Sequence, residues 1–121
     1  MAERPLILVV DDDAPILLLM RNLLREFGFE PIAAGNGRAA LDEARRRTPD
    51  LILLDKNMPG MTGEEVMREL RAEPALLDVP VLILSGEPLA PAELQSLGAN
   101  GAVLKPFDVA ALMQTIRAHI N

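Results

Sequence analysis

The sequence lacks cysteine, tyrosine and tryptophan, and it has only three phenylalanines and one histidine. Without cysteine the chain forms neither disulfides nor thiolate metal sites, which suits the cytoplasm. It also lacks the roughly 20 consecutive apolar residues of a membrane span, and the short apolar run 6–10 has no signal-peptide cleavage pattern after it. A net charge of -6 argues against direct binding to nucleic acid or to an anionic membrane.

What the chain does contain is a regular alternation of apolar runs and amphipathic segments. Its 121 residues suit a single domain over 1–121, and half of them are hydrophobic, which is enough for a substantial core. Runs that are apolar at successive positions are typical of strands covered on both faces. They predict strands at 6–10, 51–54, 81–84 and 102–104, with 31–34 as a weaker fifth.

The segments between the strands predict helices, with capping residues and stop signals at their ends. The 88–97 helix is the weakest, because prolines at its start confine it to about two turns. In the first helix, an apolar stripe is expected to face inward, and it consists of Ile16, Leu19, Met20, Leu23 and Phe27. The helices run from an Asp13 cap to Gly28, from an Asn36 cap to Pro49, over 63–72, over 88–97, and from an Asp108 cap through Ile120.

Five strand–helix units with short crossovers predict an α/β fold with right-handed connections. We expect a doubly wound, flavodoxin-like sheet of five parallel strands in the order 2-1-3-4-5, with helices on both faces.

Polar side chains follow four of the predicted strands, at the edge where an open α/β sheet binds its ligands. Crowded carboxylates repel one another unless a cation joins them, and their oxygens suit Mg²⁺. A carboxylate can attack phosphorus, and a lysine can pair with phosphate. The set therefore predicts phosphoryl transfer with Mg²⁺ as the cofactor. Its members are Asp11–Asp13, Asp55–Asn57, Ser85 and Lys105.

Four motifs carry a resemblance to a known family. In this order, and over essentially the whole chain, they resemble the receiver domain of bacterial two-component response regulators, and they are similar to the single-domain chemotaxis-type regulators. The motifs are VVDDD at 9–13, LLDKNMPGMTG at 53–63, LSG at 84–86 and GAVLKPF at 101–107.

The resemblance implies a role for each residue of the reaction. Asp55 matches the phosphoacceptor, Ser85 the hydroxyl that turns toward the phosphoryl group, and Lys105 the invariant lysine, whose bond to Pro106 is expected to be cis. The implied donor is a phosphohistidine of a sensor kinase or of a histidine phosphotransfer protein, and small phosphodonors can replace it. The implied output is a downstream protein partner or a fused effector domain.

The resemblance also implies the metal site. Asp12 matches the acid that ligates Mg²⁺ directly, and Asp11 matches its neighbour, which acts largely through bound water. Asn57 matches the position whose backbone carbonyl is a further ligand. The implied metal set is therefore Asp11, Asp12, Asp55 and Asn57.

The chain departs from the family pattern near its fourth helix. Ala102 stands where the family usually has an aromatic ring that moves on activation, and the interval from Ser85 to Lys105 is shorter than usual. We therefore expect the signal to pass through the 85–97 segment. Among the other charged residues, we expect Lys56 to be solvated and His119 to be exposed at the end of the last helix.

Three functional alternatives remain open at this point. The first is a phosphoacceptor that catalyses its own phosphorylation and dephosphorylation without being a turnover enzyme. The second is an aspartate-nucleophile phosphatase, although Asn57 stands where such enzymes need a second acid. The third is a degenerate receiver that only scaffolds a partner. The chain is expected to be a stand-alone regulator, with a receiver cut from a longer protein as the alternative.

Overall fold

Ten regular elements alternate along residues 4–120, the part of the chain that the computed structural model describes. The strands are β1 (Leu6–Val10), β2 (Glu30–Ala34), β3 (Leu51–Asp55), β4 (Val81–Ser85) and β5 (Gly101–Leu104). The helices are α1 (Ala14–Glu26), α2 (Gly37–Arg46), α3 (Gly63–Ala72), α4 (Pro91–Leu97) and α5 (Val109–Ala118). Within residues 4–120, no helix has the length and apolar character needed to cross a membrane.

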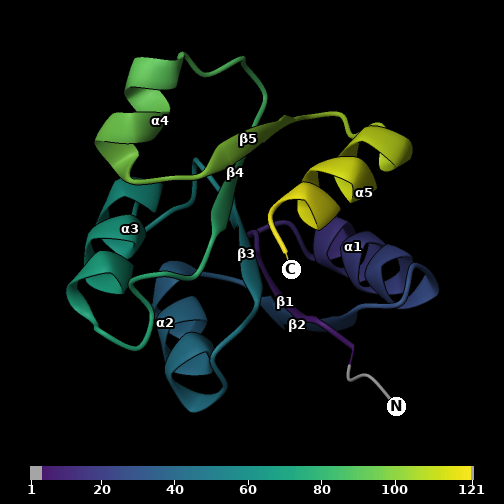
Figure 1. The fold of residues 1–121 in the computed structure, drawn as a ribbon, viewed down its shortest axis with the longest axis horizontal. Helices are drawn as coiled ribbons and strands as arrows, with labels where there is room; N and C mark the ends of the chain where they lie inside the picture. Colours follow the sequence, from purple (N-terminus) through teal and green to yellow (C-terminus); the bar gives the residue numbers. More distant parts are fainter. Residues whose placement is uncertain (1–3, 121) are drawn as a thin grey trace.

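The strands pair in parallel in the order β2-β1-β3-β4-β5, which confirms the predicted fold. Helices α1 and α5 cover one face of the sheet, and α2, α3 and α4 cover the other (Figure 1). Within β1, Ile7 and Val9 pack on the α1–α5 side, whereas Leu8 and Val10 pack on the α2–α3 side. Every residue of β1, β3 and β4 is buried, because these strands are covered on both faces.

Polar residues close the ends of the helices. As predicted, Asp13, Asn36 and Asp108 accept backbone N–H groups at the starts of α1, α2 and α5. At the other end of α5, the ring nitrogen Nδ1 of His119 lies 2.8 Å from the carbonyl oxygen of Thr115. The expectation of an exposed His119 is therefore wrong: the ring folds back on its own helix and is half-buried.

The inward stripe of α1 differs from the prediction. The residues buried in this helix are Met20 and Leu24, one turn apart on the face toward the sheet, whereas Leu19 is 49% exposed. Phe27 is 38% exposed, because it lies beyond the last helical residue. Its ring stacks under the guanidinium of Arg117, with 5.9 Å between the guanidinium carbon and the ring centroid.

Helix α4 is shorter than predicted and weakly anchored. It begins at Pro91, not at residue 88, because Pro88 lies in the exposed segment before it. Its N-cap, Ala90, has no side chain that can accept a hydrogen bond, and none of its residues is buried. Leu94 and Leu97 are partly buried and provide the apolar packing of this helix against the core.

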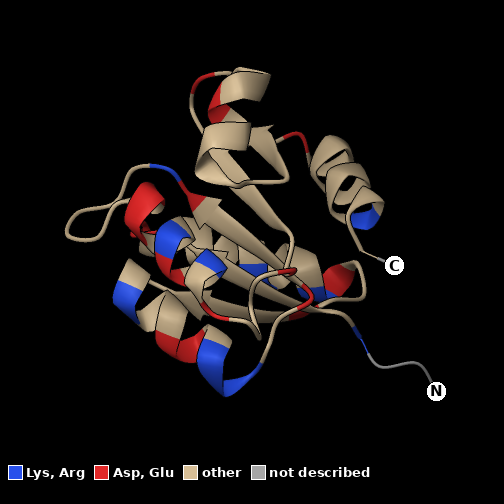
Figure 2. Ribbon diagram, turned by 60° about the vertical axis from the view of Figure 1, so that its left-hand side comes forward, with Lys and Arg blue, Asp and Glu red and all other residues tan. Residues whose placement is uncertain are grey.

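Charged residues are concentrated on α2 and α3 and are sparse on α4 and α5 (Figure 2). Glu93 is the single charged residue of α4, and Arg117 is the single charged residue of α5. The end of α2 is joined to the residue after α3 by an ion pair of 2.5 Å between Arg45 and Glu73. The charge of Glu93 thus stands apart on an otherwise uncharged helix.

Arg71, near the end of α3, connects this helix by hydrogen bonds to the segment before β4 and to the end of α4. Its guanidinium donates to the backbone carbonyls of Leu76, Leu77 and Val79 at 2.9–3.2 Å. It also donates at 3.0 Å to the carbonyl of Gly98, the C-cap of α4. Burial lowers the pKa of Arg71 from its ordinary value. These bonds fix the C-terminal end of α4 against α3 and the start of β4.

Replacing Arg71 with methionine keeps most of the side-chain stem but removes every donor. We expect Arg71→Met to lower the free energy of unfolding by about 1.5–3 kcal/mol, because several carbonyls lose a charged hydrogen-bond partner. Urea denaturation measures this. Arg68→Met is the matched control, since Arg68 is exposed on the same helix. Equal effects of the two substitutions would contradict this role of Arg71.

Candidate phosphoryl-transfer site

Strand register brings two aspartates together at the carboxyl edge of the sheet. Val10 of β1 pairs with Leu54 of β3, so the next residues along the two strands, Asp11 and Asp55, come side by side. Asp12 follows at once, and carboxylate oxygens of all three aspartates lie within 4.8 Å of one another. Asp11 and Asp55 are buried, with 1% and 7% exposure, whereas Asp12 is open to solvent. The result is a dense cluster of negative charge with one open side.

Lys105 brings the one ammonium group to this cluster. Its backbone N–H donates to the carbonyl of Ser85 at 2.8 Å, which ties the end of β5 to the end of β4. Its Nζ lies 3.0 Å from Asp11 Oδ2 and 3.3 Å from Asp55 Oδ1. The peptide bond between Lys105 and Pro106 is cis, as expected. Burial alone would lower the pKa of Lys105, but the hydrogen bond to Asp11 and the charges of Asp55 and Asp11 outweigh burial and raise it.

The charge of the cluster is only partly neutralised. Burial, and then the charge of Asp11, raise the pKa of Asp55, although Lys105 and the N–H of Asn57 act in the opposite direction. Asp11 itself accepts from the N–H of Asp13 at 3.0 Å. Three carboxylates thus share one ammonium. A divalent cation on the open side, held by these hard oxygens, would remove the remaining repulsion, so the residues fit such an ion.

The other two predicted residues differ in how they meet the cluster. The N–H of Asn57 donates weakly to Asp55 Oδ1 at 3.4 Å. The hydroxyl of Ser85 is bound within its own turn, where it donates to the carbonyl of Glu87 at 2.7 Å and accepts from the N–H of Glu87 at 3.1 Å. The structure therefore brings Asp11, Asp12, Asp55 and Lys105 together and keeps Asn57 beside them, whereas the proton of Ser85 is engaged elsewhere.

The loop after β3 is held by close packing at Gly63 and by a capping box at Thr62. Gly63 packs so closely that a Cβ there would lie 3.1 Å from the carbonyl oxygen of Lys56. Thr62 and Glu65 form a capping box at the start of α3, which the T-x-x-E spacing signals. Lys56, which we expect from the sequence to be solvated, is partly exposed and forms an ion pair with Glu93 of α4 at 3.1 Å. No local pattern signals that pair, because its members are 37 residues apart in the chain.

Comparison with known proteins gives the same family throughout. Residues 7–117 match the sequence model of the response regulator receiver domain. The chain is 38% identical over 113 residues to the chemotaxis protein CheY of Pseudomonas aeruginosa, with 91% of each chain covered. It is also 38% identical over 120 residues to the DNA-binding response regulator MtrA of Mycobacterium tuberculosis. That alignment covers 98% of this chain but 51% of MtrA, so the chain spans about half the length of MtrA.

Solved structures agree. The chemotaxis response regulator CheY4 of Vibrio cholerae superposes with a TM-score of 0.91 at 32% identity, covering 97% of this chain and 99% of that one. The response regulator TrrA of Thermotoga maritima, solved in complex with Mg²⁺ and BeF, superposes with a TM-score of 0.85 at 33% identity, covering 96% and 99%.

The fold and the site together define an α/β phosphoacceptor domain, with an acid cluster and one lysine at the carboxyl edge of a parallel sheet. The chain belongs to the family of response regulator receiver domains of two-component signalling.

The raised pKa of Asp55 makes a prediction about stability without metal. A carboxyl group with a raised folded-state pKa destabilises the fold above that pKa, and the penalty disappears as the pH falls below the unfolded-state value. We therefore expect Asp55→Asn to unfold at higher urea than the wild type at pH 7 in the presence of a chelator. The difference is expected to shrink as the pH falls toward the ordinary carboxyl range of about 4.

Asp13→Asn is the control for that comparison. It removes the same charge from an exposed cap position where asparagine is equally accepted. An Asp55→Asn protein that is less stable than the wild type at pH 7 would show that burial of the charge is not the dominant effect at Asp55.

Proposed function

We propose that this chain accepts a phosphoryl group on the carboxylate of Asp55. The observation that carries the proposal is the placement of Asp55 Oδ1 3.3 Å from Lys105 Nζ, inside the acid cluster. An aspartate carboxylate can attack phosphorus directly, and the reaction then depends on positioning and on charge neutralisation. Lys105 supplies one positive charge for the phosphoryl oxygens. The complex of the similar TrrA with Mg²⁺ and BeF supports this assignment.

Mg²⁺ is the proposed cofactor. Asp11, Asp12 and Asp55 would hold the ion, and the backbone carbonyl of Asn57 is a further proposed ligand. When bound, the ion supplies the positive charge that the three carboxylates and the incoming phosphoryl oxygens lack. Ser85 is proposed to donate its hydroxyl proton to a phosphoryl oxygen, once its bond to Glu87 is broken.

The proposed partners follow from this chemistry. The donor is a phosphohistidine on a sensor kinase or a histidine phosphotransfer protein, and the output is a downstream protein or a fused effector domain. MtrA is DNA-binding as a whole protein of about twice this length. For this chain, whose net charge is -6, we propose no direct contact with nucleic acid. Because a kinase draws its phosphoryl group from ATP, we propose the cytoplasm as the compartment.

We further propose that the protein is a switch that catalyses its own phosphorylation and dephosphorylation, without turnover of a separate substrate. A phosphatase of the aspartate-nucleophile type needs a second acid two residues after the nucleophile, where this chain has Asn57. A purely scaffolding role would not require Asp55 to be buried beside Lys105, so this arrangement favours a phosphoacceptor.

The proposal is tested by incubation with acetyl phosphate and Mg²⁺, followed by intact mass spectrometry. We expect the wild type to gain one phosphoryl group. Asp55→Asn and wild type in a chelator should gain none, whereas Asp13→Asn should behave as the wild type, because Asp13 only caps α1. Phosphorylation that persists in Asp55→Asn would place the acceptor elsewhere.

Metal binding is tested by stability. At about 100 times its dissociation constant, Mg²⁺ is expected to raise the free energy of unfolding by about 2.7 kcal/mol. Asp12→Asn should need at least about tenfold more Mg²⁺ for the same gain, because it removes a proposed ligand. Thermal unfolding over a Mg²⁺ series measures this, with Asp13→Asn as the matched control. An unchanged requirement in Asp12→Asn would remove Asp12 from the ligand set.

A further inference from the structure

The hydroxyl of Ser85 cannot serve the phosphoryl group in the arrangement that the structure shows. A serine hydroxyl has a single proton to donate. The carbonyl of Glu87 takes that proton at 2.7 Å, and the N–H of Glu87 donates back to the same oxygen at 3.1 Å. Donation to a phosphoryl oxygen on Asp55 therefore requires the hydrogen bond from Ser85 to Glu87 to break. Whatever holds this turn controls access to the donor.

The turn leads into α4 through a stiff segment. Two of the residues between Glu87 and Glu93 are prolines, Pro88 and Pro91, and each fixes its own φ angle. Two fixed φ angles reduce the number of torsions through which this segment can absorb a displacement. The position of the first turn of α4 and the position of the Ser85–Glu87 turn are therefore coupled.

The first turn of α4 rests on one polar contact. The carboxylate of Glu93 lies 3.1 Å from Lys56 Nζ, and Lys56 is itself anchored in the sheet, because its N–H donates to the carbonyl of Leu84 at 3.0 Å. This is the one side-chain hydrogen bond or ion pair that joins the first turn of α4 to the rest of residues 4–120. The far end of the helix is fixed separately by Arg71 on Gly98.

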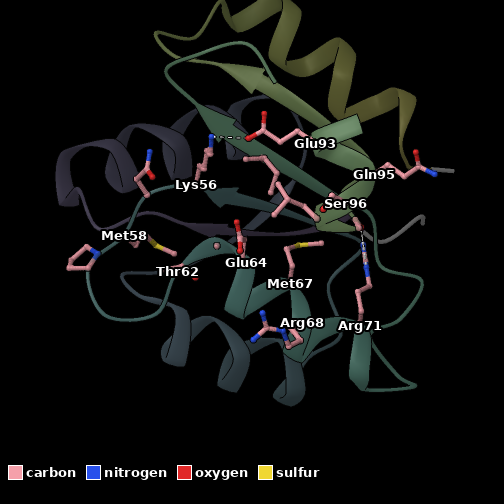
Figure 3. Close-up of a pocket in the computed structure, with 16 residues that line it drawn as sticks. Lys56, Met58, Thr62, Glu64, Met67, Arg68, Arg71, Glu93, Gln95 and Ser96 are labelled. Atoms are coloured by element: carbon pink, nitrogen blue, oxygen red, sulfur yellow. Dashed lines mark hydrogen bonds and ion pairs between the residues drawn. The ribbon is translucent and has the colours of Figure 1, made fainter. Parts of the chain in front are cut away.

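Glu93, in the first turn of α4, borders a groove. This groove, of about 970 Å³, lies between α3 and α4, and the Lys56–Glu93 pair crosses it, as the dashed line in Figure 3 shows. Met58 and Met67 line the groove on the side of α3, and Ile83 and Leu97 contribute further apolar surface. The polar contacts of α4 thus hold its C-terminal end through Arg71 and its first turn through Lys56, while Leu94 and Leu97 pack against the core.

We propose that Lys56 and Glu93 are positioning residues for phosphoryl transfer: their ion pair holds the first turn of α4, and through it the Ser85–Glu87 turn, in the arrangement that withholds the Ser85 hydroxyl from Asp55. The inference rests on the proposed function of Asp55. Lys56, the residue after the proposed phosphoacceptor, and Glu93 thus form an ion pair that we call the latch of α4. Breaking the pair frees the turn, so that Ser85 reaches the phosphoryl group more often.

The test measures the rate of phosphorylation by acetyl phosphate and Mg²⁺, together with amide exchange at residues 86–93 without the phosphodonor. Lys56→Gln and Glu93→Gln each break the pair. We expect each to raise both rates about two- to fivefold, the range of an exposed ion pair. The charge swap Lys56→Glu with Glu93→Lys should return both rates to wild-type values. Arg68→Gln and Glu64→Gln, which change the charge equally within the same groove, should change neither rate.

Repeating the substitutions in the Ser85→Ala variant distinguishes an effect through the Ser85 hydroxyl from a general increase in the mobility of the domain. If the pair acts through the Ser85 hydroxyl, Glu93→Gln should no longer raise the phosphorylation rate there, although it should still speed amide exchange. The inference is overturned if Lys56→Gln and Glu93→Gln match their controls, if the charge swap fails to restore the rates, or if the gain persists in Ser85→Ala. A wild type that gains no phosphoryl group at all would refute the proposed function and this inference together.

Discussion

The structure depends on an imbalance of charge that the sheet holds in place. Three carboxylates with oxygens within 4.8 Å of one another share a single ammonium, that of Lys105. Such groups repel one another, and burial together with the charge of Asp11 raises the pKa of Asp55. The domain keeps them together because Asp55 ends β3 while Asp11 and Asp12 follow β1, and these two strands are paired with each other. The excess negative charge of the carboxylates can bind a divalent cation, and the cation can in turn bind a phosphoryl group.

The sheet tolerates this repulsion between carboxylates because the strand residues that precede the site are apolar and buried. The residues of β1 and β4 up to the site, and those of β3 before Asp55, are buried between two helical layers. That burial supplies the large favourable term of folding, so a few unfavourable interactions at the edge are tolerated. The same rigidity fixes the distances of the site, because a parallel sheet covered on both faces has little freedom to adjust. The core and the site therefore occupy consecutive residues of the same strands.

The sequence was sufficient for the fold and for the convergence of the acids, because both follow from periodicity and from strand ends. Asp11 and Asp55 had to meet once β1 and β3 were neighbours. The sequence did not predict contacts between side chains that are distant in the chain, because no local pattern marks such pairs. Leu19 is exposed because α1 turns a narrow face to the sheet, and Lys56 pairs with Glu93 of α4, both of which line the groove between α3 and α4. The hydroxyl of Ser85 bonds within its own turn, and strand order does not determine such a rotamer.

The absence of an aromatic ring at Ala102 changes what a conformational switch in this domain must use. With no large side chain to exchange one pocket for another on β5, we propose that the two states differ in polar contacts around α4. An exposed ion pair such as Lys56–Glu93 contributes about 0.2–1 kcal/mol, which biases an equilibrium without locking it. A hydrogen bond from Ser85 to a charged phosphoryl oxygen contributes about 1.5–3 kcal/mol, so it exceeds the latch. Phosphorylation therefore has enough free energy to reverse the preference of the turn, and the small size of the latch is what makes the reversal possible.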